Sequence, residues 1–329
     1  MKLCLVSPYE PRFVGLGNYV KALLPSLLGF GGVDRLVVLS DTDAAATRAF
    51  GGRLELQPAW DPESPLALSQ IVRALQREQP DVAWFNTGLI CGRNPLANMA
   101  RLYVPVLARR RGIHSVVTLH HMMEAEPLNL LGVRHSPIHR AAGHLATRWQ
   151  FKADRVCLTL RRYVALAEQT YKAKNAVHIP HHTFGLPPAT TRTGTARRLL
   201  FFGVMAPYKG IDVLLDAFSR ARKVLPALEL RLAGARHPRF DGQVVDRSPL
   251  PGVCWLGAVP ERRVDQLMRW ADVVVVPSLA STGSSSVIHR AAAHGKTIVA
   301  SAIPDFMALA QDEHIAMELV EPGNPGILS

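Results

Sequence analysis

The sequence has few of the residues that mark secreted, metal-binding or membrane-spanning proteins. Its 329 residues include 4 cysteines, which lie far apart without a Cys-x-x-Cys pair. Isolated thiols are typical of a reducing compartment and do not suggest a zinc site. No run of about 18 uncharged apolar residues is present, so no membrane-spanning helix is expected. Residues 1–8 are apolar over too short a stretch for a signal peptide and predict a buried strand of a cytoplasmic protein.

Acidic residues are fewer than basic ones: the sequence has 26 Asp and Glu and 38 Lys and Arg, which gives a net charge of +12. Residues 1–185 hold 22 basic and 13 acidic residues, a net +9, with Arg109–Arg111 as the densest cluster. One interpretation is a solvated basic face. The other is attraction to a lipid-phosphate acceptor or to an anionic membrane, at whose inner surface the protein would be peripheral. Nucleic acid is not expected, since no aromatic interleaving accompanies the charge.

Short apolar runs alternate with helical patterns along the chain. In the first half, strands are predicted at 3–6, 36–39, 82–85, 115–119, 155–158 and 176–179, with helices at 18–28 and 66–77 among them. The second of these helices carries Leu68, Ile71, Val72 and Leu75, the spacing of one buried face. Short apolar strands separated by helices predict a parallel sheet covered on both faces.

The alternation stops at a proline-rich and then polar stretch and begins again after it. We therefore predict an N-terminal domain over 1–185, a linker over 186–198 and a C-terminal domain over 199–329. In the last, strands are predicted at 199–202, 228–232, 253–255, 273–276, 297–300 and 315–320, and helices at 211–224, 261–270 and 284–294, the last with Gly295 at its C-terminal cap. Gly-x-Gly-x-x-Gly is absent from both halves, which disfavours a dehydrogenase.

Several segments have the order and spacing of one enzyme family. They are residues 201–212, 253–260, 271–278 and 292–301 in the second half, and 118–121, 153–156 and 179–181 in the first. These segments resemble the retaining glycosyltransferases of family 4, the group 1 family. The resemblance implies the GT-B fold: two Rossmann-like parallel-sheet α/β domains facing a cleft. Family members continue through further helices after the last strand, and the second domain is expected to lack them.

The resemblance also implies an activity. A sugar would pass from a nucleotide-diphosphate sugar bound to the C-terminal domain to a glycan, lipid-linked or small-molecule acceptor on the N-terminal side. The transfer would retain the anomeric configuration and use neither metal nor cofactor. The predicted donor-binding residues are Gly15, Gly17, Gly203, Lys209, Val259, Thr282, Gly283, Ser284, Ser285, Ser286 and Arg290. The predicted catalytic residues are His120 and Lys209.

Each of these roles has a chemical reason and a simpler alternative. Lys209 is a fixed cation for the departing diphosphate, or else a solvated loop charge. Ser284–Ser286 open a helix with N–H and hydroxyl donors for phosphate, although one serine suffices as a plain cap. Gly15 and Gly17 let backbone approach a ligand, or else form a simple turn with Asn18 as the helix cap.

His120 ends a strand, where open parallel sheets bind ligands, and the alternative is an ordinary core or surface histidine. His121, His181 and His182 are candidates of lower rank. A metal is not expected at these histidines, because no His-x-x-x-His spacing appears. Asp41-Thr42-Asp43 resembles the metal-binding pair of GT-A transferases. We reject that interpretation, because a single GT-A domain leaves residues 199–329 unexplained.

The sequence departs from the family at three positions. Val204 stands where an Arg is common, and Thr282 and Arg290 stand where many members carry two glutamates. A guanidinium donates hydrogen bonds and cannot accept them from a ribose. We therefore expect Arg290 to turn toward the diphosphate in place of the missing Arg, the alternatives being that it points away or into solvent. The departures also leave open a degenerate protein that binds a nucleotide sugar or a partner enzyme without turnover.

Overall fold

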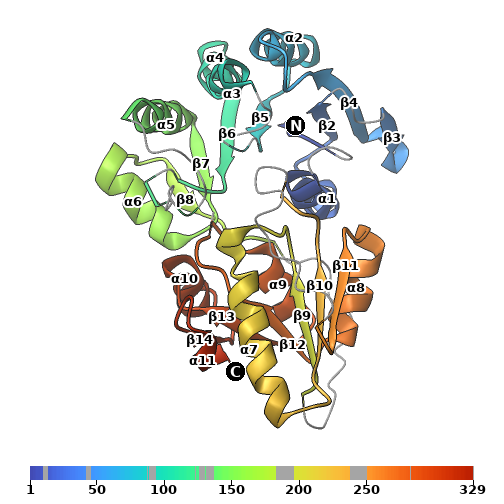
Figure 1. The fold of residues 1–329 in the computed structure, drawn as a ribbon. Coiled ribbons are helices and arrows are strands. Elements are labelled where there is room, and N and C mark those ends of the chain that lie inside the picture. The colour runs from blue at the N-terminus through green and yellow to red at the C-terminus, as the bar shows by residue number, and fades with distance from the viewer. Residues whose placement is uncertain are drawn as a thin grey trace. The chain divides into compact units, whose positions relative to one another are not determined.

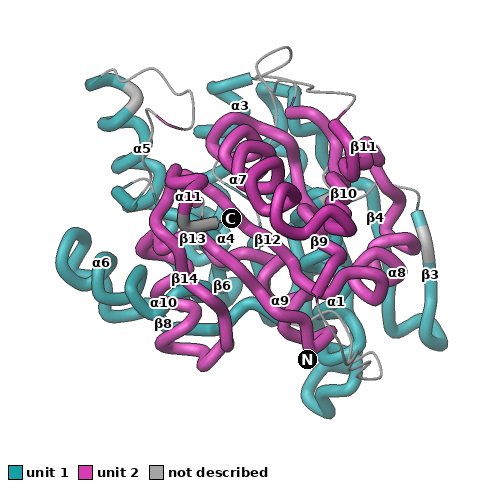
Figure 2. The backbone as a smooth tube through the Cα atoms, turned by 60° about the horizontal axis from the view of Figure 1, so that its bottom comes forward, with its two compact units in different colours: residues 1–126, 135–182 teal, residues 127–134, 183–329 magenta. Residues whose placement is uncertain are grey.

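The computed structural model describes residues 1–9, 14–41, 46–86, 88, 94–122, 124–125, 130, 137–182, 196–237, 250–281 and 283–328. The chain forms two compact units, one of residues 1–126 and 135–182 and the other of residues 127–134 and 183–329 (Figure 2). Each unit contains one sheet (Figure 1). Most of the predicted linker, residues 186–195, lies outside the described residues.

Unit 1 is built on a sheet of order β3-β4-β2-β1-β5-β6-β7-β8, in which all neighbours are parallel except β3 and β4. Its strands are β1 (Lys2–Val6), β2 (Arg35–Asp41), β3 (Thr47–Ala49), β4 (Leu54–Trp60), β5 (Val82–Phe85), β6 (His114–Leu119), β7 (Arg155–Leu158) and β8 (Ala176–His178). Its helices are α1 (Val14–Gly29), α2 (Ala67–Glu78), α3 (Pro95–Arg101), α4 (Val104–Arg110), α5 (Pro137–Gln150) and α6 (Arg161–Tyr171), with a short 3-10 turn η1 (Phe50–Gly52).

The six strands predicted in this half are confirmed to within two residues at each end. Cys4, Leu5 and Val6 are consecutive and fully buried, which is the pattern of a parallel strand covered on both faces. The antiparallel pair β3–β4 was not predicted, because β4 contains Pro58 and is largely half-exposed, so its apolar signal is weak. Helix α1 already includes residue 14, which places Asn18 within the helix and makes its interpretation as the cap wrong.

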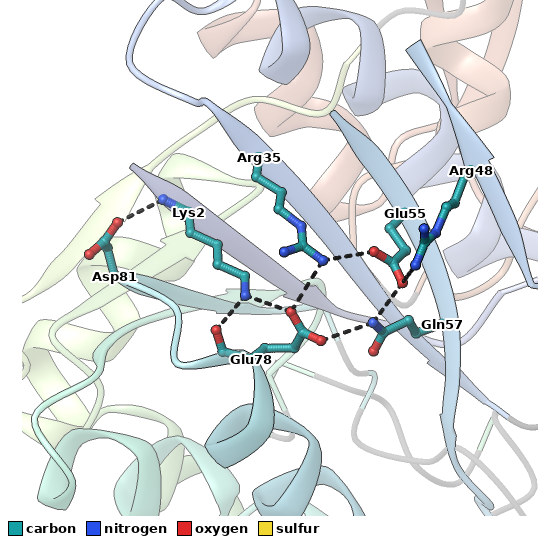
Figure 3. A network of polar contacts seen from close by, with 7 residues as sticks. All are labelled: Lys2, Arg35, Arg48, Glu55, Gln57, Glu78 and Asp81. Carbon is teal, nitrogen blue, oxygen red and sulfur yellow. Dashed lines mark hydrogen bonds and ion pairs between the residues drawn. The ribbon is translucent and has the colours of Figure 1, made fainter. Parts of the chain in front are cut away.

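A polar network closes the amino-terminal edge of this sheet (Figure 3). Lys2 of β1 pairs with Glu78 at the end of α2, with Nζ to Oε2 at 2.6 Å, and Arg35 of β2 pairs with Glu55 of β4 at 2.8 Å. Gln57 donates to both carboxylates, each at 2.9 Å. Hydrogen bonds from Gln57 and Arg35 lower the pKa of Glu55. The network therefore joins three strands and a helix at the edge opposite to the strand ends where ligands are expected.

Unit 2 has a wholly parallel sheet of order β11-β10-β9-β12-β13-β14. Its strands are β9 (Arg198–Phe202), β10 (Glu229–Ala233), β11 (Val253–Gly257), β12 (Val273–Val276), β13 (Thr297–Ser301) and β14 (Glu318–Val320). Its helices are η2 (Pro207–Lys209), α7 (Ile211–Val224), α8 (Glu261–Trp270), α9 (Ser286–Ala293), α10 (Pro304–Asp312) and α11 (Pro325–Leu328). In the described part of the whole chain, every helix is too short or too polar to cross a bilayer.

The apolar pattern predicted this unit closely. Helices α7 and α8 have the predicted bounds, and α9 begins two residues later than expected. Apolar side chains of α7, including Leu214, Leu215 and Phe218, pack on those of β9 and β10 in one buried cluster. Gly295 follows α9 with φ 60°, a left-handed conformation that favours glycine, so the predicted cap is confirmed.

Two glycines with similar backbone angles offer a matched test of this packing. Gly210, at the start of α7, has φ 68°, and a Cβ there would lie 2.0 Å from the carbonyl oxygen of Pro277. Gly295 has φ 60° and nothing within 4 Å of such a Cβ. We expect Gly295→Ala to lower the free energy of unfolding by about 1–2 kcal/mol through strain alone. Gly210→Ala should cost about 1–3 kcal/mol more through the clash. Urea unfolding followed by circular dichroism measures both, and equal losses would contradict the close approach.

Candidate active site

In unit 1, polar residues follow the two strands on either side of the point where the strand order reverses. Ser7 is the first residue after β1 and Asn86 the first after β5, and both are fully buried. The backbone N–H of Asn86 donates to the Val6 carbonyl at 2.8 Å, which fixes the start of this loop. Ligands of open parallel sheets bind at such switch points, outside the carboxyl ends of the strands.

His120, directly after β6, is a third polar residue next to Ser7 and Asn86. Its Nε2 lies 2.6 Å from Oδ1 of Asn86, and the Asn86 amide donates in turn to Ser7 Oγ at 3.0 Å. The ring of Tyr19, from α1, meets the His120 ring edge to face with centroids 4.6 Å apart. The same tyrosine contacts the rings of His181 and His182 at 5.2 and 4.7 Å.

The two histidines after β6 are held neutral. Protein atoms surround both rings although each keeps some exposed surface, and this desolvation lowers the pKa of His120 to about 3, with further contributions from His121 and His182. Desolvation alone lowers the pKa of His121 to about 4. At neutral pH, His120 therefore acts as a neutral donor and acceptor of hydrogen bonds. Within the described residues, no three His, Cys, Asp or Glu side chains are arranged to hold a metal ion.

In unit 2, the loop after β9 packs against the loop after β12. The carbonyl of Tyr208 accepts a hydrogen bond from the N–H of Leu279 at 2.8 Å. Gly210 adjoins Pro277 closely, as described above, and a Cβ on Gly234 would lie 1.7 Å from the Gly203 carbonyl. Glycine is thus required for three backbone segments to meet here. This contact fixes the loop that carries Lys209, whose Nζ lies 5.3 Å from the centroid of the Tyr208 ring.

The start of α9 presents several hydrogen-bond donors. Ser285 caps the helix by accepting from the N–H of Ile288 at 3.4 Å, while Gly283 donates its N–H to Asp305 at 3.2 Å. The hydroxyl groups of Ser284 and Ser278 are buried without a hydrogen-bond partner among the described residues. Buried hydroxyls are normally paired. Ser284 directly precedes the cap of α9 and Ser278 lies in the loop after β12, and two unpaired hydroxyls in this segment match what a phosphate ligand would satisfy.

Arg290 takes a different place from the one expected. Its side chain is buried within α9 and forms an ion pair with Glu261, and its Nε lies 3.7 Å from Asp265. Both carboxylates belong to α8, so these contacts tie the two helices together. The contacts do not support a role at the diphosphate, which stays a prediction.

The structure brings the other predicted donor residues together only in part. Gly203 and Lys209 lie between β9 and α7, and Gly283, Ser284 and Ser285 lie between β12 and α9, whose first residue is Ser286. Val259 follows β11, and Thr282 lies outside the described residues. Gly15 and Gly17 lie in the first turns of α1, in unit 1. Asp41 accepts from the N–H of Tyr9 at 2.6 Å, while Thr42 and Asp43 lie outside the described residues.

Sequence reasoning missed four residues of these sites: Ser7, Tyr19, Asn86 and Asp305. Asn86 had an available signal, since it directly follows a buried strand, as His120 does. Asp305 sits in the first turn of α10 and showed only the ordinary pattern of a helix start. Its contact with Gly283 spans 22 residues and could not be read from either segment alone.

The second unit is similar to a known family. Residues 196–328 match the family model of the glycosyl transferases group 1. The resemblance seen in the sequence motifs is therefore confirmed. No curated protein sequence matches the chain significantly.

Solved structures with the same fold cover the whole chain. HepE from Anabaena, crystallised in complex with UDP and glucose, is 18% identical with a TM-score of 0.71, over 100% of this chain and 88% of that one. Sucrose-phosphate synthase from Thermosynechococcus elongatus is 16% identical with a TM-score of 0.71, over 100% and 88%. A glycosyltransferase from Rickettsia africae is 15% identical with a TM-score of 0.64, over 99% and 86%. These similarities confirm the GT-B fold with its two Rossmann-like domains.

The neutral state of His120 in this glycosyl transferase predicts a pH dependence. An unfolded histidine has a pKa near 6.5, so the stability that a neutral ring contributes is complete above that pH. It is lost as the pH falls from 6.5 toward 3, because only the unfolded chain takes up the proton. We expect the unfolding free energy to fall between pH 8 and 5, with about 1–2 kcal/mol of the loss due to His120.

His120→Gln should remove that share of the pH dependence, and urea unfolding at several pH values measures it. His114→Gln, at the exposed start of β6, is the matched control for the removal of a histidine. Identical slopes for His120→Gln and the wild type would show that the His120 ring takes up a proton equally well in both states.

Proposed function

We propose that the chain transfers a sugar from a nucleoside-diphosphate sugar to a hydroxyl group of an acceptor, with retention of configuration and without a metal ion. The observation that carries the proposal is the fixed loop of Lys209 together with the unpaired hydroxyls of Ser278 and Ser284 in the segment between β12 and α9. The match of residues 196–328 to the group 1 glycosyl transferases supports it. Three similar structures contain UDP, UDP with glucose, or UDP-glucose, so uridine is the base to test first.

The proposed reaction depends on stabilising the negative charge of the leaving diphosphate. The bond between the anomeric carbon and the diphosphate oxygen breaks, and negative charge develops on the diphosphate. Lys209, the N–H groups at the start of α9 and the serine hydroxyls would stabilise that charge. The acceptor oxygen forms the new bond from the face the diphosphate leaves, and its proton passes to a phosphate oxygen. No side-chain nucleophile is required, and His120 would bind a hydroxyl group of the reacting sugars.

A binding and turnover experiment tests this function. UDP and GDP are titrated calorimetrically with and without EDTA, and a panel of UDP- and GDP-sugars is screened for transfer and slow hydrolysis. We expect binding that EDTA leaves unchanged and turnover of at least one sugar. Loss of binding in EDTA would refute the metal-free part of the proposal. Binding without turnover of any sugar would instead indicate a degenerate transferase, which the absence of the two family glutamates makes the second candidate.

Lys209→Ala should lower the transfer rate by about 10²–10³-fold, because one electrostatic contact with the leaving group is lost. Its free energy of unfolding should change by less than about 0.5 kcal/mol, as for most surface substitutions. Lys223→Ala, an exposed lysine at the end of α7, is the matched control and should transfer at the wild-type rate. If Lys209→Ala also keeps the wild-type rate, Lys209 takes no part in the reaction.

We further propose that unit 1 binds an anionic membrane surface that presents the acceptor. Helix α5 has no acidic residue, and Arg140, His144 and Arg148 are exposed along it. The apolar side chains of Ile138 and Leu145, on the same helix, are 79% and 44% exposed. Basic and apolar residues mixed on one exposed helix are typical of interfacial binding.

The basic residues of α4 extend this surface. Helices α4 and α5 pack together, with the rings of Tyr103 and Trp149 5.1 Å apart. The predicted cluster Arg109–Arg111 lies at the end of α4, although Arg109 is partly engaged by Asp154, with Nε to Oδ1 at 3.1 Å. The most available charges are therefore on α5.

Arg140→Glu with Arg148→Glu should weaken binding to vesicles of phosphatidylserine and phosphatidylcholine by at least about tenfold at low salt. Each basic residue near such a surface contributes about 1 kcal/mol, and salt should screen the attraction. Arg73→Glu with Arg77→Glu makes the same charge change on exposed positions of α2 and is the control. Co-sedimentation measures both variants. If both double variants bind the vesicles equally, only the total charge of the protein matters. If the wild type does not bind the vesicles, the basic surface of α5 is only a solvated face.

A further inference from the structure

A buried chain of hydrogen bonds runs from the backbone at Pro8 to the ring of His120. The Ser7 hydroxyl donates to the Pro8 carbonyl at 2.9 Å, the Asn86 amide nitrogen lies 3.0 Å from Ser7 Oγ, and Asn86 Oδ1 lies 2.6 Å from His120 Nε2. Ser7 and Asn86 are fully buried, so water does not compete for these groups. All the members belong to unit 1.

The direction of every bond follows from its fixed end. The Pro8 carbonyl can only accept, so the Ser7 hydroxyl donates to it and offers its oxygen as an acceptor. The Asn86 amide must therefore present its NH₂ group to Ser7. The Leu16 carbonyl, at 3.5 Å from the same nitrogen, also only accepts and requires the same orientation. Asn86 Oδ1 is then left facing His120.

From this chain we infer that Asn86 is a positioning residue, which holds the proton of the His120 imidazole on Nε2 and leaves Nδ1 as a hydrogen-bond acceptor. A rotated amide would leave the Pro8 and Leu16 carbonyls without their donors, and unsatisfied buried groups cost about 1–3 kcal/mol each. Nδ1 is then suited to a hydroxyl group of a sugar and unsuited to a group that only accepts. This last step rests on the proposed function, whereas the position of the proton does not.

The surroundings keep the ring neutral, which the inference requires. Tyr19, His181 and His182 pack around the ring or around each other, and His121 adjoins it in the chain. Burial lowers the pKa of His120 to about 3, with His121 and His182 adding to the effect. The phenol of Tyr19 stays protonated as well, because burial raises its pKa to about 12. At neutral pH, neither the Tyr19 phenol nor the His121 ring, whose pKa burial lowers to about 4, carries a charge that competes with Asn86 in placing the proton.

Nitrogen-15 NMR of histidine-labelled protein measures the tautomer without substrate. We expect His120 to show a protonated Nε2 and an unprotonated Nδ1 from pH 8 to pH 5, with slow exchange of the Nε2 proton. A proton on Nδ1, or a mixture of both forms, would overturn the inference. Asn86→Leu should speed exchange of the Nε2 proton at least tenfold, while the control Asn175→Leu, whose amide donates to the Phe151 and Ala153 carbonyls, should not.

Kinetics test the positioning role separately, with the donor that turns over in the sugar panel. Asn86→Leu should lower kcat by about 10–100-fold, as loss of an orienting partner does, with UDP affinity unchanged. Asn86→Asp keeps the acceptor for Nε2, adds a negative charge and should raise the acid limb of the pH–rate profile by about 1–3 units. If the acid limb of Asn86→Asp is not shifted, or if Asn86→Leu keeps the wild-type kcat, Asn86 does not position the His120 ring. If the wild type transfers no sugar, the proposed function fails, and the NMR result still decides the tautomer.

Discussion

The reversal of strand order in each sheet is the constraint on which both sites depend. In unit 1 the chain runs from β1 to β2 on one side and returns to β5 on the other, and in unit 2 it runs from β9 to β10 and returns to β12. Because the connections from the two central strands leave toward opposite sides of the sheet, no crossover covers the carboxyl ends of these strands. The first residues after those strands are Ser7 and Asn86 in one unit and Gly203 and Pro277 in the other.

The two units fill this position by different means. In unit 1 the junction is made by side chains, because Asn86 reaches Ser7 on one side and His120 on the other. In unit 2 it is made by backbone, because Tyr208 accepts from Leu279 and Gly210 closely approaches Pro277. The first arrangement orients an imidazole, and the second fixes a loop with buried, unpaired serine hydroxyls at Ser278 and Ser284. An oriented imidazole suits recognition of hydroxyl groups, whereas unpaired hydroxyl donors suit an anion.

This difference explains what the sequence could and could not predict. The strands of unit 2 and its helices α7, α8 and α9 were predicted from apolar runs, whereas α10 was not. The loops after β9 and β12 were singled out because glycines, a lysine and a run of serines mark them locally. Most strands of unit 1 were predicted from apolar runs, but β4 was not, because Pro58 and half-exposed residues hide its period. The link between Asn86 and His120 spans 34 residues and depends on the pairing of β5 with β6. No local pattern carries that information, whereas the sheet order does.

Arg290 shows how a departure from a family pattern can be locked in by packing. Resemblance placed a carboxylate at this position, but the guanidinium here is buried and paired with Glu261 beside Asp265. A glutamate at 290 would meet these two carboxylates, and like charges at a buried site disfavour ionisation and stability. The arginine and the two acids of α8 therefore form one set, which a single substitution cannot return to the family pattern.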